Sequence, residues 1–414
     1  MSRNPETCIQ EIYLKGYKSI KDLTVNLQPD LNIIIGANGS GKTNFLEFLD
    51  ATFKNDYERL FTENEFNITI KGLIDAPEGQ FIVARTGKKN TNRRSKEEAY
   101  IIEEYLSDGE MNIHYLDDNK KMTWGGTWGG TWGGGSILKP SVRFLQFDNP
   151  LNLILTEKIN IVINFTNEEN EQNGHVYDIN TYLSKSSKHT FLNDLFHIDP
   201  SISRDKWHEY KNIGDAVQEA TSNKMFDIGY LIKSLNQFTP IKDFKIDWAL
   251  TRRTIKKDEN IEKSGTALIE GIDFQFFVND EWLNWTQLSD GTKRLFYIIG
   301  SFVYSEPNQI YLLEEPEIGI YPHQLNLLMN FIKAQSRHTQ ILLTTHSPQV
   351  LNCLTEEELD RIIVARYEGK AGTKMYHLSD EEKRFASNYM KNEAFLSDYW
   401  MQSGFMNEES IESL

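Results

Sequence analysis

The eight residues from Gly36 to Thr43 constrain the fold of this chain more than any other segment. They read GANGSGKT, which matches the pattern GxxxxGK[ST]. The apolar run Leu31–Ile35 before them predicts a buried strand, and Thr43–Phe53 carries apolar residues at helical spacing. A strand, a glycine-rich turn and a helix in this order expose backbone N–H groups at a helix N-terminus, where anions bind. The segment therefore predicts a phosphate-binding loop in an α/β sheet.

Most residues of this loop are candidates for holding phosphate. Glycines let the backbone turn so that successive N–H groups face an anion, and Lys42 is expected to reach the β- and γ-phosphates of a nucleoside triphosphate. The hydroxyl of Thr43 is expected to ligate Mg²⁺. The candidate binding residues in the loop are Gly36, Asn38, Gly39, Ser40, Gly41, Lys42 and Thr43.

Two further apolar runs end in polar residues that suit nucleotide hydrolysis. Residues 309–317 read QIYLLEEPE, which predicts a buried strand that ends at Glu314 and Glu315. One carboxylate there can hold the Mg²⁺ shell, and the next can orient or deprotonate the attacking water. Residues 341–345 predict another buried strand, and His346 follows it at the sheet edge where α/β folds bind ligands.

A fourth block lies just before the paired acids. Residues 288–294 read LSDGTKR and precede an apolar helix, so Ser289 and Gly291 can present a hydroxyl and free N–H groups to an anion. Taken alone, the segment is explained equally well by an ordinary helix cap.

The order of the four blocks resembles the ABC-type ATPase head that transporters, SMC-like proteins and RecF-like repair ATPases share. The resemblance covers residues 1–60 and 280–414. It implies an α/β fold in which a RecA-like core sheet with helices is joined to an antiparallel β subdomain, here with a mostly helical insert. It also implies ATP and Mg²⁺ as ligands.

This resemblance assigns roles to the signature loop. In that family, the serine and glycine that correspond to Ser289 and Gly291 contact the γ-phosphate held by a second subunit. The resemblance therefore implies a homo-oligomer, a head-to-head dimer or a larger assembly, in which each active site is completed by a neighbouring copy.

The resemblance also assigns the hydrolytic residues. Glu315 stands at the position of the catalytic glutamate, and His346 at that of the switch histidine near the γ-phosphate. Glu314 stands at the position of the acid that holds the Mg²⁺ shell. Gln146 follows the strand-like VRFL and stands at the position of the Q-loop glutamine, which implies contact with the nucleotide and Mg²⁺.

Glu314 narrows the resemblance, because most ABC heads carry aspartate at that position. EEPE followed by IGIYP is similar to the EEPE-x-x-LHP form of OLD-like ATPases in bacterial anti-phage systems, with Tyr321 where histidine is usual. The tail from Tyr376 onward is similar to the ends of stand-alone ATPases of this group, such as those of the PARIS (AriA) and Septu (PtuA) systems. The sequence does not distinguish between these two.

The resemblance implies an ATP-binding and ATP-hydrolysing subunit of an anti-phage defence complex, which senses infection through a phage-derived trigger. Closure of head dimers would control a separate toxic effector, a Toprim or HNH nuclease. OLD nucleases carry a Toprim domain after the head, and the residues after Pro348 are too few for one, so we expect that the chain is not itself a nuclease. A DNA-repair ATPase of the RecF or SMC kind is the alternative, although the missing heptads exclude long SMC arms. A transport ATPase is a weaker third reading.

The sequence divides into an N-terminal ATPase lobe over 1–150, a helical insert over 151–240 and a C-terminal lobe over 241–414. Short β-like runs between residues 66 and 116 predict an antiparallel patch. Residues 123–136, TWGGTWGGTWGGGS, predict a flexible or hairpin-tip loop. Its tryptophans suit base stacking or contact with a partner, and a repeat that is merely tolerated in a surface loop is the remaining interpretation.

Charge and composition limit the partners. A net charge of −16 argues against nucleic acid over the whole surface, because phosphate binding needs a positive face. Two cysteines without a CxxC pair, no signal peptide and no apolar run of about 18 residues predict a cytoplasmic protein without membrane contact. Two groups of basic residues are open to interpretation as nucleic-acid grooves or as solvated loops. They are Arg85, Lys88, Lys89, Arg93, Arg94 and Lys96, and Lys242, Lys245, Arg252, Arg253, Lys256 and Lys257.

Overall fold

The computed structural model describes most of the chain, in two compact units. The first unit comprises residues 1–146, 306–318 and 325–414, and the second comprises 147–305 and 319–324. The described residues are 5–75, 79–91, 96, 99–105, 111–120, 122–128, 141–145, 159–170, 174–183, 229–258, 261–303, 309–392 and 394–403.

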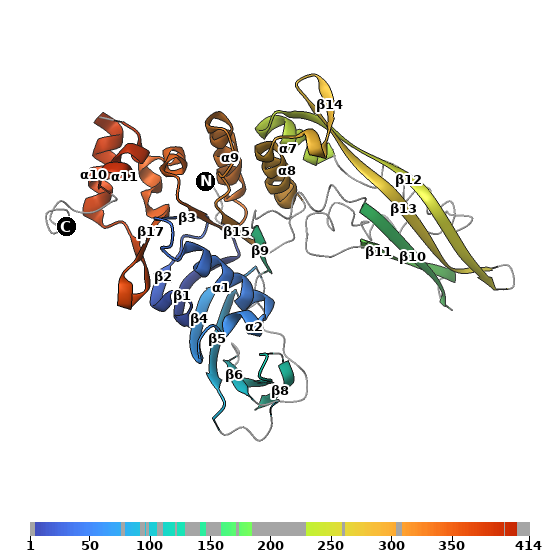
Figure 1. The fold of residues 1–414 in the computed structure, drawn as a ribbon, viewed down its shortest axis with the longest axis horizontal. Helices are drawn as coiled ribbons and strands as arrows, with labels where there is room; N and C mark the ends of the chain where they lie inside the picture. Colours follow the sequence, from blue (N-terminus) through green and yellow to red (C-terminus); the bar gives the residue numbers. More distant parts are fainter. Residues whose placement is uncertain are drawn as a thin grey trace. The chain divides into compact units, whose positions relative to one another are not determined.

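A mainly parallel sheet forms the centre of the first unit (Figure 1). Its order is β18-β17-β3-β16-β15-β9, parallel from β17 to β9, with β18 antiparallel at one edge. Strands β3 and β16 are buried at every residue, as expected for parallel strands that are covered on both faces. The predicted strands over 31–35, 309–314 and 341–345 are confirmed. The strands are β3 (Leu31–Ile35), β9 (Ser141–Leu145), β15 (Gln309–Glu314), β16 (Ile341–Thr345), β17 (Ile362–Tyr367) and β18 (Thr373–His377).

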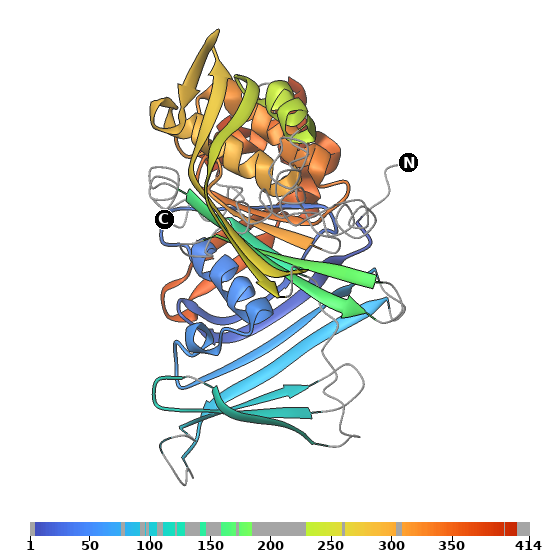
Figure 2. The ribbon, with the colours of Figure 1, turned by 90° about the vertical axis from the view of Figure 1, so that its right-hand side faces the viewer.

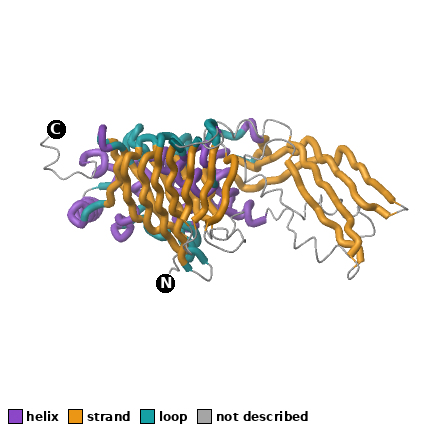
Figure 3. Tube along the Cα trace, turned by 90° about the horizontal axis from the view of Figure 1, so that it is seen from below, coloured by secondary structure: helices purple, strands orange, loops and turns teal. Residues whose placement is uncertain are grey.

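A second, antiparallel sheet belongs to the same unit (Figure 3). Its order is β2-β1-β4-β5-β6-β7-β8, and buried residues alternate with solvent-facing residues along β4 and β5. This alternation is the pattern of strands with one face on a core. The predicted antiparallel patch is confirmed. The strands are β1 (Cys8–Tyr17), β2 (Ile20–Asn26), β4 (Glu65–Leu73), β5 (Gln80–Lys89), β6 (Tyr100–Tyr105), β7 (Met111–Leu116) and β8 (Met122–Trp128).

Helix α1 (Lys42–Lys54) lies between these two sheets (Figure 2). Its buried Phe45, Leu46, Phe48 and Leu49 belong to one apolar core that also contains residues of β1, β4 and β5 on one side and of β3, β15, β16 and β17 on the other. Burying each such side chain contributes roughly 1.5–3 kcal/mol. The helix that follows the glycine-rich loop is therefore fixed on both sides.

The C-terminal end of α1 meets a buried ion pair. Arg85 on β5 is 1 % exposed and donates hydrogen bonds to the carbonyl of Thr52 (2.6 Å), to Asn55 Oδ1 (2.7 Å) and to Glu104 Oε1 (2.6 Å). Arg85 therefore cannot contact nucleic acid, which corrects the first basic group of the sequence analysis. Burial alone would raise the pKa of Glu104, but the hydrogen bond from His114 and the charge of Arg85 lower it to about 2.

The second unit is built on long antiparallel strands. The strand order is β11-β10-β13-β12, with β14 also paired to β13 across a tight turn at Asn279 and Asp280, whose φ angles of 51° and 67° suit a hairpin. Helices α7 and α8 contact each other, and α7 contacts β12. The elements are β10 (Ile159–Asn170), β11 (Gly174–Leu183), α7 (Gly229–Phe238), β12 (Ile241–Asp258), β13 (Ile261–Val278), β14 (Glu281–Asn284), the short helix η3 (Trp285–Gln287) and α8 (Asp290–Val303).

An aromatic cluster fixes α8 on this sheet. Phe296 of α8 lies 5.0 Å from Phe276 and 5.2 Å from Phe244, measured between ring centroids. Trp285 lies 5.9 Å from Phe296 and 5.8 Å from Phe276. Such aromatic pairs stabilise beyond the area that they bury, so the start of α8 is held firmly.

Two sequence predictions need correction. The insert over 151–240 is not mostly helical in its described part, because residues 159–183 contain β10 and β11. Apolar residues at every second position of INIVINF are the period of a half-buried strand, which the prediction of a helical insert overlooked. The described part of this insert also contains helix α7, whereas residues 184–228 lie outside the described residues.

The Trp–Gly segment is also only partly a loop. Residues 122–128 form β8, which pairs with β7, while 129–136 lie outside the described residues. Pairing with a neighbouring strand thus overrides the weak strand propensity of glycine there.

The remaining helices lie near the C-terminal half of the chain, apart from α2. These helices are α2 (Tyr57–Leu60), α9 (Pro322–Gln335), the short helices η4 (Pro348–Cys353), η5 (Glu356–Arg361) and η6 (Gly369–Ala371), α10 (Asp380–Asn392) and α11 (Leu396–Ser403). No helix among the described ranges is long and apolar enough to cross a membrane.

Replacing Glu104 with Gln is expected to lower the free energy of unfolding by about 3 kcal/mol at neutral pH, because Arg85 loses its buried counter-charge. A carboxyl with a lowered pKa stabilises the fold above its ordinary pKa of 4.5, and this contribution is lost as the pH falls toward about 2. Urea denaturation should therefore find a difference between wild type and Glu104→Gln that shrinks below about pH 4.5.

Glu103→Gln is the matched control. Its partner Lys88 is exposed, so the change should cost less than about 1 kcal/mol at any pH. A Glu104→Gln difference that stays constant into acid would contradict an ionised, paired Glu104.

Candidate nucleotide-binding and hydrolysis site

Two glycines of the loop are required by the backbone around them. A Cβ on Gly36 would lie 2.2 Å from the carbonyl oxygen of Ala365, and one on Gly41 would lie 2.0 Å from Thr373 Oγ1. Gly41 also has φ of +95°, and Gly39 has φ of +78° but open space around it. The loop can follow this path only because no side chain stands at 36 and 41.

Lys42 begins α1 and turns its side chain back along the loop. Its ammonium donates hydrogen bonds to the carbonyls of Gly36 (2.8 Å) and Ala37 (3.1 Å). Burial lowers the pKa of Lys42, and the carboxylates of Glu315, Glu317 and Glu314 oppose that change. A cation that is held this way at a helix N-terminus suits the binding of a polyphosphate.

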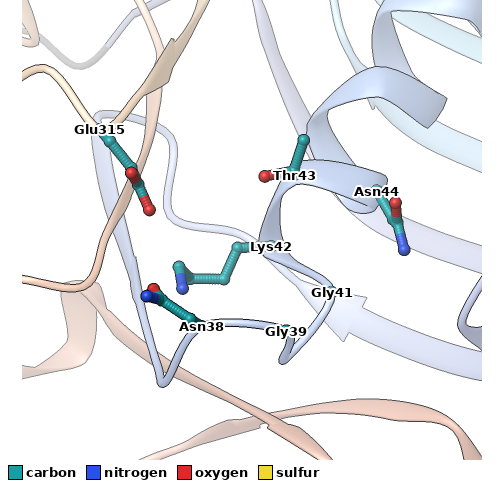
Figure 4. Close-up of a pocket in the computed structure, with 7 residues that line it drawn as sticks. All are labelled: Asn38, Gly39, Gly41, Lys42, Thr43, Asn44 and Glu315. Carbon is teal, nitrogen blue, oxygen red and sulfur yellow. The ribbon is translucent and has the colours of Figure 1, made fainter.

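The loop lines a pocket of about 380 Å³ (Figure 4). Glu315 faces the loop across the pocket, and Thr43 and Lys42 lie between Glu315 and Gly41 in the view. The buried Ser40 Oγ has no hydrogen-bond partner among the described residues, so it is available for a ligand. The lining residues are Asn38, Gly39, Gly41, Lys42, Thr43, Asn44 and Glu315.

These residues fit a magnesium–triphosphate ligand. A glycine-rich loop with a lysine and an orphaned serine hydroxyl suits the phosphates, and a hydroxyl with nearby carboxylates suits a hard cation that otherwise keeps phosphate and water ligands. Thr43 and Glu314 are the residues here that would hold Mg²⁺, which supplies positive charge against the phosphates when bound. Gln146, the third predicted contact, lies outside the described residues.

The end of β15 carries the hydrolytic candidates. Glu315 has φ of +43°, a strained conformation for a residue with a side chain, and its N–H donates to the carbonyl of Thr344 (2.9 Å). Its Oε1 lies 3.0 Å from His346 Nδ1. The structure thus brings Glu315, His346 and the phosphate-binding loop together in the first unit.

Sequence reasoning missed a third acid of the EEPE segment. Glu317 is 8 % exposed, and its Oε1 accepts a hydrogen bond from Thr345 Oγ1 on β16. Burial raises the pKa of Glu317, and the charge of Glu315 adds to that increase, whereas the bond from Thr345 opposes it. Only its place two residues after Glu315 could have drawn attention to it.

Sequence reasoning also missed the contacts that link the start of α1 to Ser19 and Thr373. Asn44 Nδ2 donates to Ser19 Oγ (2.7 Å), and Ser19 Oγ lies 2.7 Å from Thr373 Oγ1. Thr373 N–H donates in turn to the carbonyl of Ser19 (2.8 Å). These residues are far apart in the sequence, and no local pattern joins them.

The signature residues Ser289 and Gly291 lie in the second unit, at the start of α8. Ser289 Oγ accepts from the N–H of Thr292 (3.2 Å), as a helix cap does. A Cβ on Gly291 would lie 2.5 Å from the carbonyl of Gly319, so the position admits only glycine without movement. The capping interpretation therefore holds within one copy, and Ser289 itself is exposed.

The chain matches known proteins in both sequence and fold. Residues 157–352 match the family described as "AAA domain, putative AbiEii toxin, Type IV TA system", a range that contains the signature, the EEPE segment and His346 but not the glycine-rich loop. Endonuclease GajA of Bacillus cereus (strain VD045) is 23 % identical over 368 residues, which cover 85 % of this chain and 57 % of GajA. The chain thus spans little more than half the length of that relative.

Two further matches cover less of the chain or are less similar in sequence. The DNA replication and repair protein RecF of Bacillus cytotoxicus is 30 % identical over 116 residues, which cover 25 % of this chain and 30 % of RecF. The Smc head domain with an extended coiled coil, solved with the C-terminal domain of ScpA derived from Pyrococcus furiosus, is 12 % identical with a TM-score of 0.49, and the match covers 93 % of this chain and 99 % of that one.

A glycine-rich loop after β3, acids after the neighbouring β15 and a histidine after β16, on a sheet joined to an antiparallel one, define an ABC-type P-loop ATPase. The matches to this family model, to GajA and to RecF agree with the resemblance to OLD/SMC/RecF-type ATPases drawn from the motifs.

Gly41→Ala is expected to abolish measurable ATP binding, because a methyl group there meets buried Thr373 and forces the loop to move. Gly39→Ala is the matched control, since its left-handed φ costs only about 1–2 kcal/mol and its affinity should fall at most about tenfold. Titration with a fluorescent ATP analogue compares the two. Equal affinities would contradict the close approach of Thr373 to the loop.

Proposed function

We propose that this chain binds and hydrolyses ATP at sites shared between two copies of itself. ATP-dependent closure of the two heads then controls a separate effector, a nuclease, within an anti-phage defence complex. One observation carries the proposal: the phosphate-binding loop and the strained Glu315 line one pocket, and His346 Nδ1 lies 3.0 Å from Glu315 Oε1.

The chemistry divides among residues of the first unit. Lys42 and the loop N–H groups hold the β- and γ-phosphates, and Ser40 adds a hydroxyl donor. Glu315 accepts a proton from, or orients, the attacking water, and His346 fixes the Glu315 carboxylate from its Nδ1 side. Thr43 and Glu314 would hold Mg²⁺, which would supply positive charge against the phosphates.

The second copy contributes the signature loop. In one copy alone, Ser289 caps its own helix by accepting from the N–H of Thr292, and Ser289 and Asp290 at the start of α8 are exposed. ATP held by one copy then binds Ser289 and Gly291 of the other, so the nucleotide stabilises the closed dimer and hydrolysis releases it.

Glu315→Gln tests this function directly. The variant should bind ATP but turn it over at least about a hundredfold more slowly, because the group that activates water is lost. It should elute as a dimer with ATP in gel filtration with light scattering and as a monomer with ADP. Lys42→Ala in the same background is the control, since it removes phosphate binding and should stay monomeric. A Glu315→Gln variant with normal turnover would remove Glu315 from this role.

Mixing two inactive variants tests whether the site is shared. Ser289→Arg should bind ATP in single copies but block closure, and Lys42→Ala should not bind ATP. Mixed in equal amounts they should recover about a quarter of wild-type turnover, because half the dimers are mixed and one of their two sites is intact. Full activity of Ser289→Arg alone would show that each copy holds a complete site.

The effector part of the proposal rests on the EEPE segment and on the likeness to GajA, whose name is that of an endonuclease. Native complexes purified from the source cells and identified by mass spectrometry should contain a second protein with a Toprim or HNH nuclease domain. Nuclease activity from this chain alone would refute a separate effector and leave the ATPase role intact.

The likeness to RecF favours a second candidate, a DNA-repair ATPase. Such a protein should be stimulated several-fold by DNA, and the stimulation should fall steeply with salt because it depends on phosphate contacts. A defence regulator should hydrolyse ATP at the same rate with and without DNA.

A further inference from the structure

Glu317 has an environment that a merely structural surface acid would not have. It is 8 % exposed, and its Oε2 receives no hydrogen bond from another residue in the described part of the chain. A buried carboxylate with an unsatisfied oxygen is costly, and such groups tend to be retained at functional sites. Glu317 is also second only to Glu315 among the carboxylates whose charge acts on Lys42.

The other oxygen of Glu317 organises the turn after β16. Thr345 has a single hydroxyl proton, and it donates that proton to Glu317 Oε1. The lone pairs of the same hydroxyl are thereby left for the N–H of Ser347, which donates to Thr345 Oγ1 (2.9 Å). His346 lies between these two residues, so the turn that carries the imidazole is fixed from both sides.

The segment after β15 and the turn after β16 are therefore joined at three points. Glu315 N–H donates to the carbonyl of Thr344, Glu315 Oε1 meets His346 Nδ1, and Glu317 Oε1 accepts from Thr345. The first two contacts involve Glu315 itself. The third is the one that holds the histidine turn independently of Glu315.

We propose that Glu317 is a positioning residue for ATP hydrolysis, which acts through the Thr345 hydroxyl to hold His346 against Glu315. This inference rests on the proposed hydrolytic function. It assigns the third acid of EEPE a role different from Mg²⁺ binding and from activation of water.

Four substitutions separate positioning from chemistry. Glu317→Leu removes the acceptor at similar size, and Thr345→Val removes the donor without changing shape. Glu317→Gln keeps an amide oxygen that can accept from Thr345 but removes the charge, and Thr345→Ser keeps the hydroxyl. Thr52→Val is the matched control, since Thr52 is equally buried and its hydroxyl donates to the Phe48 carbonyl in α1.

The experiment measures kcat and KM for ATP, with thermal melting and binding of a fluorescent ATP analogue for each variant. Glu317→Leu and Thr345→Val should each lose about tenfold in kcat with KM changed less than about threefold, because only the arrangement of the hydrolytic groups is disturbed. The double variant should be no slower than Thr345→Val alone, since Thr345→Val already removes the contact with Glu317. Glu317→Gln, Thr345→Ser and Thr52→Val should stay within about threefold of wild-type kcat.

Three results would overturn the inference. Normal kcat in Glu317→Leu and Thr345→Val would remove the positioning role, and Thr345→Val alone decides the point if Glu317→Leu does not fold. A Glu317→Gln variant as slow as Glu315→Gln would make Glu317 a chemical participant instead. A raised KM with unchanged kcat would make it a binding residue. If Glu315→Gln still forms the ATP-dependent dimer in any of these cases, the proposed function stands and only this inference fails.

Discussion

The site depends on the close packing of one loop against neighbouring strands. Gly36 touches the backbone of β17 and Gly41 touches Thr373 of β18, so the loop is shaped by two strands that lie more than 300 residues later in the chain. Helix α1 then continues from the loop into a core shared by two sheets. Because interiors pack at close to crystal density, the loop cannot shift without displacing those neighbours. The backbone N–H groups of the loop are thus held in place by the surrounding fold.

Much of the fold could be predicted because its strongest signals are local. The segments that form β3, β15 and β16 are short and mostly apolar, and each is followed by a glycine-rich or polar turn, a pattern that favours a buried parallel strand. The chain order of the motifs then predicted which strand ends meet. Strand β10 could not be predicted so easily, because its second half, TNEEN, is polar at every position and carries no period of apolar residues.

Only those residues of the candidate site that belong to a sequence motif could be predicted. Lys42, Glu315 and His346 stand in recognisable segments, and the structure brings them together. Sequence motifs could not identify Thr345, Glu317, Ser19 and Thr373. Each contacts a partner that is distant in sequence, and the pairing exists only once the sheet has formed. Arg85 illustrates the reverse error. A cationic side chain among other basic residues suggested a surface groove, yet three hydrogen bonds make its burial favourable.

The contacts of Arg85 at the C-terminal end of α1 connect this helix to the antiparallel sheet. Helix α1 has 13 residues and is about 20 Å long, so it spans the distance between the glycine-rich loop and Arg85. At its C-terminal end, the Thr52 carbonyl and Asn55 Oδ1 accept hydrogen bonds from the guanidinium of Arg85 on β5. The bond from Arg85 to Glu104 extends this connection to β6, so a single helix links the loop to the antiparallel sheet.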